Sequence, residues 1–141
     1  MSIRVIVDTD PGIDDAIALL FALAHPRIEV AALTTVAGNI GLARTTANAL
    51  RILRLAGANI PVHPGAESPL ARGRADEWRI HGTDGLGGVP FPDPGAEPSP
   101  TGAVEALADM LLDAPAGSMD ILALAPLTNI AGLVRHAPEA A

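Results

Sequence analysis

The sequence of 141 residues contains no cysteine, which excludes disulfides, thiolate metal sites and cysteine nucleophiles. Aromatic residues make up only 2% of the chain, so its core must be built from Ala, Val, Ile and Leu. No run of about 18 uninterrupted apolar residues occurs, and we therefore expect no membrane span. Met1 to Arg4 lead directly into a short apolar run, so no signal peptide is expected and the default location is the cytoplasm.

Positive charge is also scarce, because 9 Lys and Arg residues stand against 16 Asp and Glu residues and leave a net charge of -7. This balance argues against a protein that binds the phosphate backbone of a nucleic acid. Hydrophobic residues are abundant at 49%, which allows a packed core and disfavours disorder. The length fits one domain or part of a larger one.

Apolar patterning predicts strands that alternate with helices. Short β-branched runs indicate buried strands, and apolar residues at helical spacing indicate helices. The expected strands are 3–7, 28–36, 61–63 and 120–125; the expected helices are 14–24, 42–56, 101–113 with Thr101 as its cap, and one from 126 or 127 to about 136. Residues 64–100 are rich in Gly and Pro and read as a long loop, which in a compact domain is usually functional or disordered.

This alternation predicts an α/β fold, with an open and mostly parallel sheet flanked by helices, over a single domain 1–141. Ligands of such sheets bind in the crevice outside the carboxyl ends of the strands. Polar residues fall at these ends: Asp8 and Asp10 after the first strand, Asn39 after the second, and 124–129 after the last. A sheet this small would be left with an open edge.

Four carboxylates lie within eight residues in the stretch VDTDPGIDDA, namely Asp8, Asp10, Asp14 and Asp15. Held together they repel one another unless a cation neutralises them, and a hard divalent ion with oxygen ligands, calcium or magnesium, is the simplest solution. Asp14 and Asp15 are neighbours at a helix start and point about 100° apart, so one can ligate the metal while the other faces a substrate. An aspartate that touches both the metal and its bound water can serve as a base. The cluster therefore indicates a metal-dependent hydrolase.

Other interpretations of the cluster are weaker. Any one of these aspartates could be only a helix cap or a turn residue. An EF-hand loop starting at Asp8 would need a glutamate at its twelfth position, where Leu19 stands. Haloacid-dehalogenase phosphatases also place a DxD pair after a first strand, but they expect Thr or Val where this chain has Pro11 and Gly12.

Three motifs, DTDPGIDDA, TTVAGN and APLTNIA, occur in this order and cover most of the chain. Together they resemble the inosine-uridine nucleoside hydrolase family. The resemblance implies a Rossmann-like α/β fold, one bound calcium ion, and hydrolysis of the N-glycosidic bond of ribonucleosides to ribose and a free base.

The resemblance also implies roles for single residues. Asp10 and Asp15 would ligate calcium, together with the backbone carbonyl of Leu124. Asp10 would also be the base that activates the attacking metal-bound water. Asp14 would hold the ribose hydroxyls, and Asn39 would contact the ribose or that water.

Four further residues complete the comparison with the family. Asp8 would lie behind the metal ligands. His81, in HGTDGLGG, matches a histidine of the family's mobile loop, either as a substrate contact or as a solvated loop residue. Trp78 could stack on a base or cover an apolar patch. Ala125 stands where the family has glycine.

Family members run to roughly twice this length, so we expect residues 1–141 to be the N-terminal part of a nucleoside hydrolase domain, with 64–100 as an active-site loop region. The family's C-terminal half supplies another aspartate ligand and further substrate contacts, so we expect little or no turnover by this chain alone. Three hypotheses remain: a nucleosidase, a haloacid-dehalogenase-type phosphohydrolase, and a non-catalytic metal-binding module. The expected partners are a ribonucleoside and further copies of the chain, as a dimer or tetramer.

Overall fold

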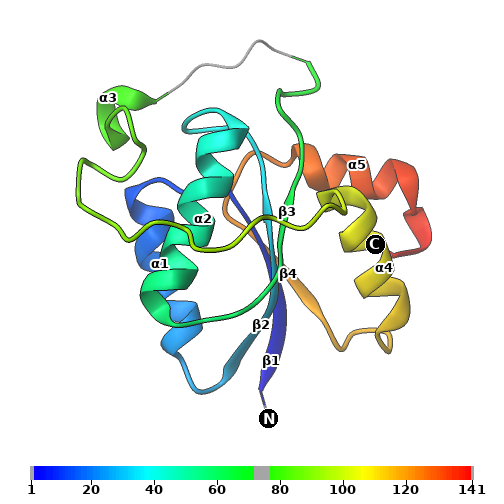
Figure 1. Ribbon diagram of the computed structural model, residues 1–141. Helices are drawn as coiled ribbons and strands as arrows, with labels where there is room; N and C mark the ends of the chain where they lie inside the picture. Colours follow the sequence, from blue (N-terminus) through cyan, green and yellow to red (C-terminus); the bar gives the residue numbers. More distant parts are fainter. Residues whose placement is uncertain (1, 72–76, 141) are drawn as a thin grey trace.

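A computed structural model describes residues 2–71 and 77–140. Four strands form one parallel sheet in the order β3-β2-β1-β4, which confirms the predicted fold class (Figure 1). The elements in chain order are β1 (Ile3–Thr9), α1 (Ile13–Ala24), β2 (Ile28–Thr35), α2 (Leu42–Ala56), β3 (Val62–Pro64), α3 (Trp78–His81), α4 (Ala103–Asp113), β4 (Asp120–Ala123), α5 (Thr128–His136) and the 3₁₀ turn η1 (Pro138–Ala140). No helix in the described ranges is long and apolar enough to cross a membrane.

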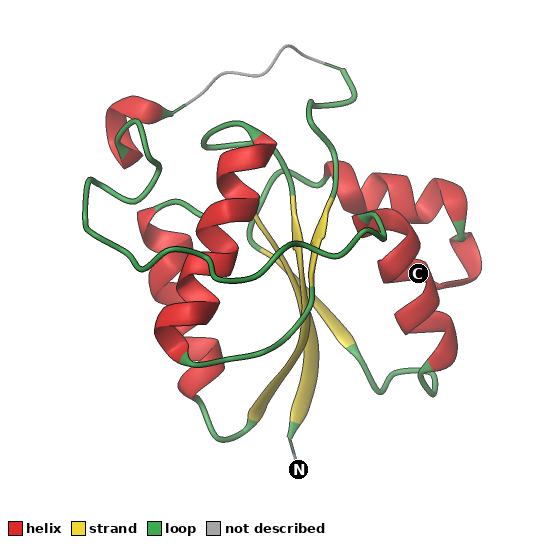
Figure 2. Ribbon diagram, viewed as in Figure 1, coloured by secondary structure: helices red, strands yellow, loops and turns green. Residues whose placement is uncertain are grey.

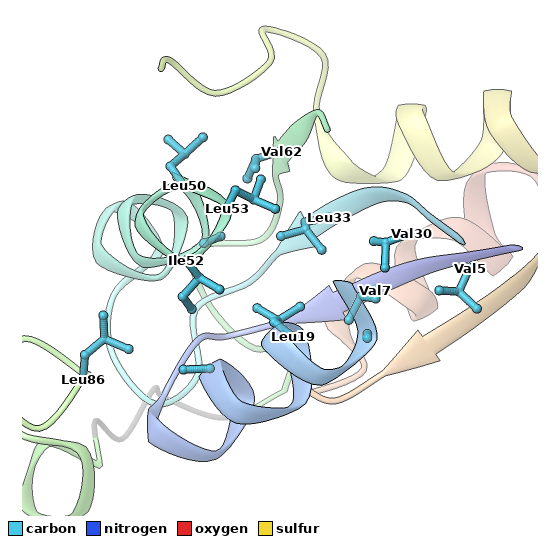
Figure 3. Packing of buried hydrophobic residues seen from close by; sticks show 13 residues of the cluster. Val5, Val7, Leu19, Val30, Leu33, Leu50, Ile52, Leu53, Val62 and Leu86 are labelled. Carbon is cyan, nitrogen blue, oxygen red and sulfur yellow. The ribbon is translucent and has the colours of Figure 1, made fainter. Parts of the chain in front are cut away.

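Helices cover both faces of the sheet, as Figure 2 shows. Alternate residues of β1 point to opposite faces, so Val5 and Val7 pack on one side and Ile6 on the other. The first side buries α1 and α2 through side chains such as Leu19 and Ile52 (Figure 3). The second side buries α4 and α5 in a smaller cluster. Because the inner part of β1 is buried on both faces, Val5, Ile6 and Val7 form a continuous apolar run and do not alternate with polar residues.

The first strand continues two residues beyond the predicted end, to Thr9. Asp8 and Thr9 pair with Thr34 and Thr35 of β2 in register. The Thr34 hydroxyl donates a hydrogen bond to Asp8 at 2.6 Å, so the buried carboxylate has a partner and the strand is not interrupted. Asp8 is therefore a strand residue and does not follow the strand.

The helix predicted to begin at Thr101 begins at Ala103, and Gly102 is its N-cap. The carbonyl oxygen of Gly102 accepts the first helical hydrogen bond, from Ala106. The carbonyl oxygen of Thr101 instead lies 3.0 Å from Nδ1 of His63, a contact that ties it to β3. Thr101 was thus wrongly predicted as the cap. The last helix likewise begins at Thr128, later than predicted.

The long loop predicted at 64–100 contains one short helix, α3, in its described part. The backbone N–H of Glu77, just before α3, donates to the carbonyl of Asn39 at 2.8 Å. This contact anchors α3 above the carboxyl ends of the strands. The strand ends themselves are aligned, because Asp8 of β1 pairs with both Thr34 of β2 and Ala123 of β4.

Candidate functional site

Asp15 lies in the first turn of α1 and is 5% exposed. Its carboxylate accepts three hydrogen bonds: from the Thr9 hydroxyl at 2.7 Å, from the Gly12 N–H at 3.2 Å, and from the Asn39 side-chain amide at 3.3 Å. The Gly12 N–H is one of the free donors at the start of the helix, where negative charge is also favoured by the helix dipole. Two donors from the adjacent sequence and one from Asn39 therefore hold this carboxylate in a defined position.

Asp10 follows β1 and is 4% exposed. The backbone N–H of Asn39 donates to its Oδ2 at 2.6 Å, and the Asn39 side-chain amide donates to its carbonyl at 3.1 Å. Burial raises the pKa of Asp10 to about 7, and the charges of Asp15 and Asp14 add to this, although the Asn39 hydrogen bond opposes it. The carboxylates are thus held close enough to repel one another, as expected for a site that takes a cation.

Asp8 is fully buried beneath these residues. Its Oδ1 accepts from Thr34 at 2.6 Å and from the side-chain amide of Asn129 at 2.8 Å. Its Oδ2 has no hydrogen-bond partner among the described residues. Burial raises the pKa of the Asp8 carboxyl, even though both hydrogen bonds lower it. The carbonyl of Asp8 accepts from the N–H of Leu124 at 2.8 Å, which ties β1 to the turn after β4. Asp8 lies behind the pocket and supports its walls.

A pocket of about 350 Å³ opens at the carboxyl ends of the strands. Five of the residues predicted from the sequence line it, namely Asp10, Asp14, Asp15, Asn39 and Leu124, and Ala125 lies beside them. Pro69 and Glu77 of the long loop region line the same pocket. The predicted residues therefore meet in one place, even though they come from three segments far apart in the sequence.

His81 lies near the pocket but is not among its lining residues. Its ring is buried, and its Nδ1 accepts a hydrogen bond from the backbone N–H of Ile13 at 3.2 Å. The same nitrogen lies 3.8 Å from the carboxylate of Asp14. The hydrogen bond from Ile13 therefore anchors α3 to the start of α1. His81 is not the solvated loop histidine that the sequence left open.

Trp78 lines a different and larger cavity of about 780 Å³, together with Ile40, Arg44 and Thr83. The indole is 52% exposed, and the Arg79 guanidinium lies 5.6 Å from its ring centre. Trp78 thus covers no closed apolar patch. The aspartates of the predicted site line the smaller pocket, so the larger cavity beside Trp78 is not the candidate site.

The oxygen-rich pocket suits a hard cation only in part. Within residues 2–71 and 77–140, no group of three or more His, Cys, Asp or Glu side chains is arranged to hold a metal ion. The carboxylates that line the pocket include Asp10 and Asp15, and burial together with the neighbouring charges of Asp15 and Asp14 raises the pKa of Asp10. Calcium prefers six to eight oxygen ligands, so these residues fit part of its coordination shell.

Sequence reasoning missed the central role of Asn129. It is fully buried, and its amide donates to Asp8 at 2.8 Å and to the Thr35 carbonyl at 3.0 Å, while its oxygen accepts from the Ala66 N–H at 3.0 Å. One side chain thus connects β1, β2, the chain after β3 and α5. The sequence did offer one signal for this role, because Asn129 is the asparagine of the APLTNIA motif.

Comparison with known proteins supports the motifs. The family model for inosine-uridine preferring nucleoside hydrolases matches residues 5–141. The non-specific ribonucleoside hydrolase RihC of Salmonella enteritidis is 44% identical over 140 residues, which are 99% of this chain and 45% of the relative.

Solved structures agree with this match. The plant nucleoside hydrolase PpNRh1 superimposes with a TM-score of 0.90 at 42% identity, over 100% of this chain and 45% of that protein. A purine-preferring ribonucleoside hydrolase from Gardnerella vaginalis gives a TM-score of 0.91 at 29% identity, over 97% of this chain and 45% of that one. The chain spans about half the length of the relatives it matches, and it belongs to the inosine-uridine preferring nucleoside hydrolase family.

Proposed function

We propose that the site takes part in calcium-dependent hydrolysis of the N-glycosidic bond of ribonucleosides, giving ribose and a free base. The observation that carries this proposal is the meeting of Asp10, Asp14, Asp15, Asn39 and Leu124 in one pocket at the carboxyl ends of the strands. A relative named as a ribonucleoside hydrolase is 44% identical over 140 residues, and a plant nucleoside hydrolase shares the fold at 42% identity. The family match favours this reaction over that of a phosphohydrolase.

Asp10 and Asp15 would hold the calcium ion, together with the carbonyl oxygen of Leu124. When bound, calcium would supply a Lewis acid that activates water and orients the hydroxyls of the sugar. Asp15 is held in place by its three donors, which suits a permanent ligand. Asp10 would remove a proton from the attacking water, and the 2.6 Å hydrogen bond from Asn39 would hold its carboxylate in place for this step.

Asp14 would bind the ribose hydroxyls. Its side chain is 84% exposed and lines the pocket, so it is free to contact a ligand, unlike the buried Asp15. Glycosidic cleavage passes through an oxocarbenium-like state, and positive charge then grows on the ribose ring. The carboxylates around the pocket would stabilise that charge without moving, because the backbone and Asn39 already fix two of them.

Calcium binding by the 141-residue chain tests the metal part of the proposal. Isothermal titration should detect a calcium site in the wild type, and Asp10→Asn or Asp15→Asn should weaken it. Asp109→Asn is the matched control, because Asp109 is an exposed aspartate on α4, away from the pocket. Equal binding by all four proteins would contradict the assignment of the two ligands.

Turnover should be measured on the chain fused to the C-terminal part of RihC that lies beyond the match, because the chain spans 45% of that relative. Calcium-dependent release of ribose from inosine and uridine, lost in Asp10→Asn, is the expected result. Release of phosphate from p-nitrophenyl phosphate instead would favour the phosphohydrolase. Calcium binding without any turnover would favour a non-catalytic metal-binding module.

A further inference from the structure

Asn48 lies in the middle of α2 and is buried, with 1% of its surface exposed. Its side-chain amide donates to the carbonyl of Pro11 at 3.3 Å and to the carbonyl of Asp84 at 2.9 Å. Asparagine is unfavourable inside a helix, and a buried amide is costly unless it is hydrogen-bonded. We therefore look for the role of Asn48 in the two carbonyls that it binds, which belong to segments far apart in the sequence.

Asp84 belongs to a segment shaped by glycine, residues 82–88, which we call the glycine segment. Four of its residues have a positive φ, between +70° and +82°, namely Gly82, Gly85, Gly87 and Gly88. Only glycine adopts this backbone conformation readily. A Cβ atom added at Gly85 would lie 2.9 Å from the amide nitrogen of Asn48. The glycine segment therefore lies directly on the Asn48 side chain.

Helix α2 holds the glycine segment at two further points. Arg44, one helical turn before Asn48, donates to the carbonyl of Thr83. Leu86 is buried in the same core cluster as Ile52 of α2, as Figure 3 shows. Asn48 differs from these two contacts because it also binds the turn between β1 and α1.

That turn carries the aspartates of the pocket. Pro11, whose carbonyl accepts from Asn48, stands between Asp10 and Gly12. The Gly12 N–H in turn donates to the carboxylate of Asp15 at 3.2 Å. A fixed Pro11 carbonyl thus holds the backbone that presents both proposed calcium ligands.

The glycine segment returns to the same turn by a second route. The N–H of Gly87 donates to the carbonyl of His81, the last residue of α3, at 2.8 Å. The ring of His81 accepts from the N–H of Ile13 at 3.2 Å. The contacts therefore form a closed ring that runs from Asn48 through the glycine segment and His81 to Ile13, and back through the turn to Asn48.

We infer that Asn48 is a positioning residue of the site, which joins the turn that carries the aspartates to the segment that holds α3 over the pocket. This inference rests on the proposed function, because the join preserves the geometry of the proposed calcium site. Glu77, the N-cap of α3, lines the pocket, so a glycine segment that loosens would move one of its walls. Asn48 is not among the lining residues and acts through the two segments that it joins.

Hydrogen exchange on the 141-residue chain tests the join. Asn48→Leu keeps most of the side-chain volume and removes both donated hydrogen bonds. Relative to the amides of β1, the amides of Gly87 and Ile13 should exchange about 10-fold faster or more, the change expected for one or two lost buried hydrogen bonds. Ile13 is the decisive position, because its own hydrogen bond does not involve Asn48.

Two further variants separate this role from a general loss of stability. Gly85→Ala leaves Asn48 intact but displaces the glycine segment, and it should speed the same two amides even if Asn48→Leu does not fold. Thr46→Val is the matched control, because it removes a buried hydrogen bond of the same helix, with Thr35 at 2.8 Å. Relative to β1, it should leave exchange at Gly87 and Ile13 unchanged.

Isothermal titration then measures the consequence for the site. Asn48→Leu should weaken calcium binding roughly 10-fold, and Thr46→Val by less than about twofold. Unchanged exchange at Ile13 in the folded variants, equal acceleration in Thr46→Val, or wild-type calcium affinity in folded Asn48→Leu would overturn the inference. A wild-type chain that binds no calcium would instead contradict the proposed function, whereas the exchange rates would still decide whether Asn48 joins the two segments.

Discussion

Gly38 stands where the chain passes directly over the Asp10 carboxylate. A Cβ atom added there would lie 2.8 Å from Cγ of Asp10, in contact with its Oδ2, and 3.0 Å from Cδ of Pro126. Real Cβ atoms essentially never come closer than 3.0 Å to such neighbours, so the carboxylate or the backbone must move. Gly38→Ala is therefore expected to displace Asp10 without removing any functional group.

The size of the effect follows from the bond that is lost. The displaced carboxylate would give up its 2.6 Å hydrogen bond from the backbone N–H of Asn39. A hydrogen bond to a charged group contributes about 1.5–3 kcal/mol, which corresponds to roughly 10–100-fold weaker calcium binding. Crowding in the packed turn should also lower the free energy of unfolding by about 1–3 kcal/mol.

Isothermal titration with calcium measures the first effect, and urea unfolding without calcium measures the second. Gly102→Ala is the matched control, because a Cβ there would lie 3.8 Å from the Pro64 carbonyl, an ordinary contact. Loss of the glycine N-cap should cost less than about 1 kcal/mol and leave calcium affinity unchanged. An unchanged affinity in Gly38→Ala would refute the role given to Asp10.

Three further outcomes are expected. Burial is the main cause that raises the pKa of Asp10 from 3.8 to about 7, so this pKa is higher in the folded than in the unfolded chain. Without calcium, the protonated Asp10 therefore contributes its full stability below about pH 4, and this contribution is lost as pH rises through about 7. The loss of stability is at most about 4 kcal/mol, and about 2 kcal/mol after solvent screening. Saturating calcium should abolish this loss. Urea unfolding between about pH 4 and 8 measures it, and a free energy of unfolding that does not fall over this range would contradict the prediction. Asn129→Ala should destabilise the chain by about 3 kcal/mol in the same assay, because it leaves buried groups unpaired, whereas Thr128→Ala on the same helix should have a much smaller effect. His81→Ala should speed hydrogen exchange at the Ile13 amide, which loses its acceptor, and equal exchange rates would show that α3 is anchored in another way.

The parts of the site that could be predicted are those that local sequence determines. Asp10 and Asp15 were correctly placed together because a strand end, a tight turn and a helix start follow one another within a few residues. Asn39 follows the neighbouring parallel strand, and parallel strands bring their carboxyl ends to one edge. Periodicity therefore predicted the fold and the meeting of these three residues.

What the sequence did not predict depends on contacts between distant segments. Asn129 bonds to Asp8 across 121 positions, and His81 bonds to Ile13 across 68. No local pattern encodes such a pair. The end of β1 was misplaced for the same reason, because Asp8 can remain in a buried strand only when Thr34 and Asn129 satisfy its carboxylate.

We propose that the carboxylate pocket takes part in calcium-dependent cleavage of nucleosides. The most direct measurement is the release of ribose from inosine by the fusion of this chain to the C-terminal part of RihC, with calcium and after its removal by a chelator. The proposal predicts ribose release that disappears with the chelator, returns with added calcium, and is absent in Asp10→Asn. Release that persists without calcium, or that is unchanged in Asp10→Asn, would contradict it.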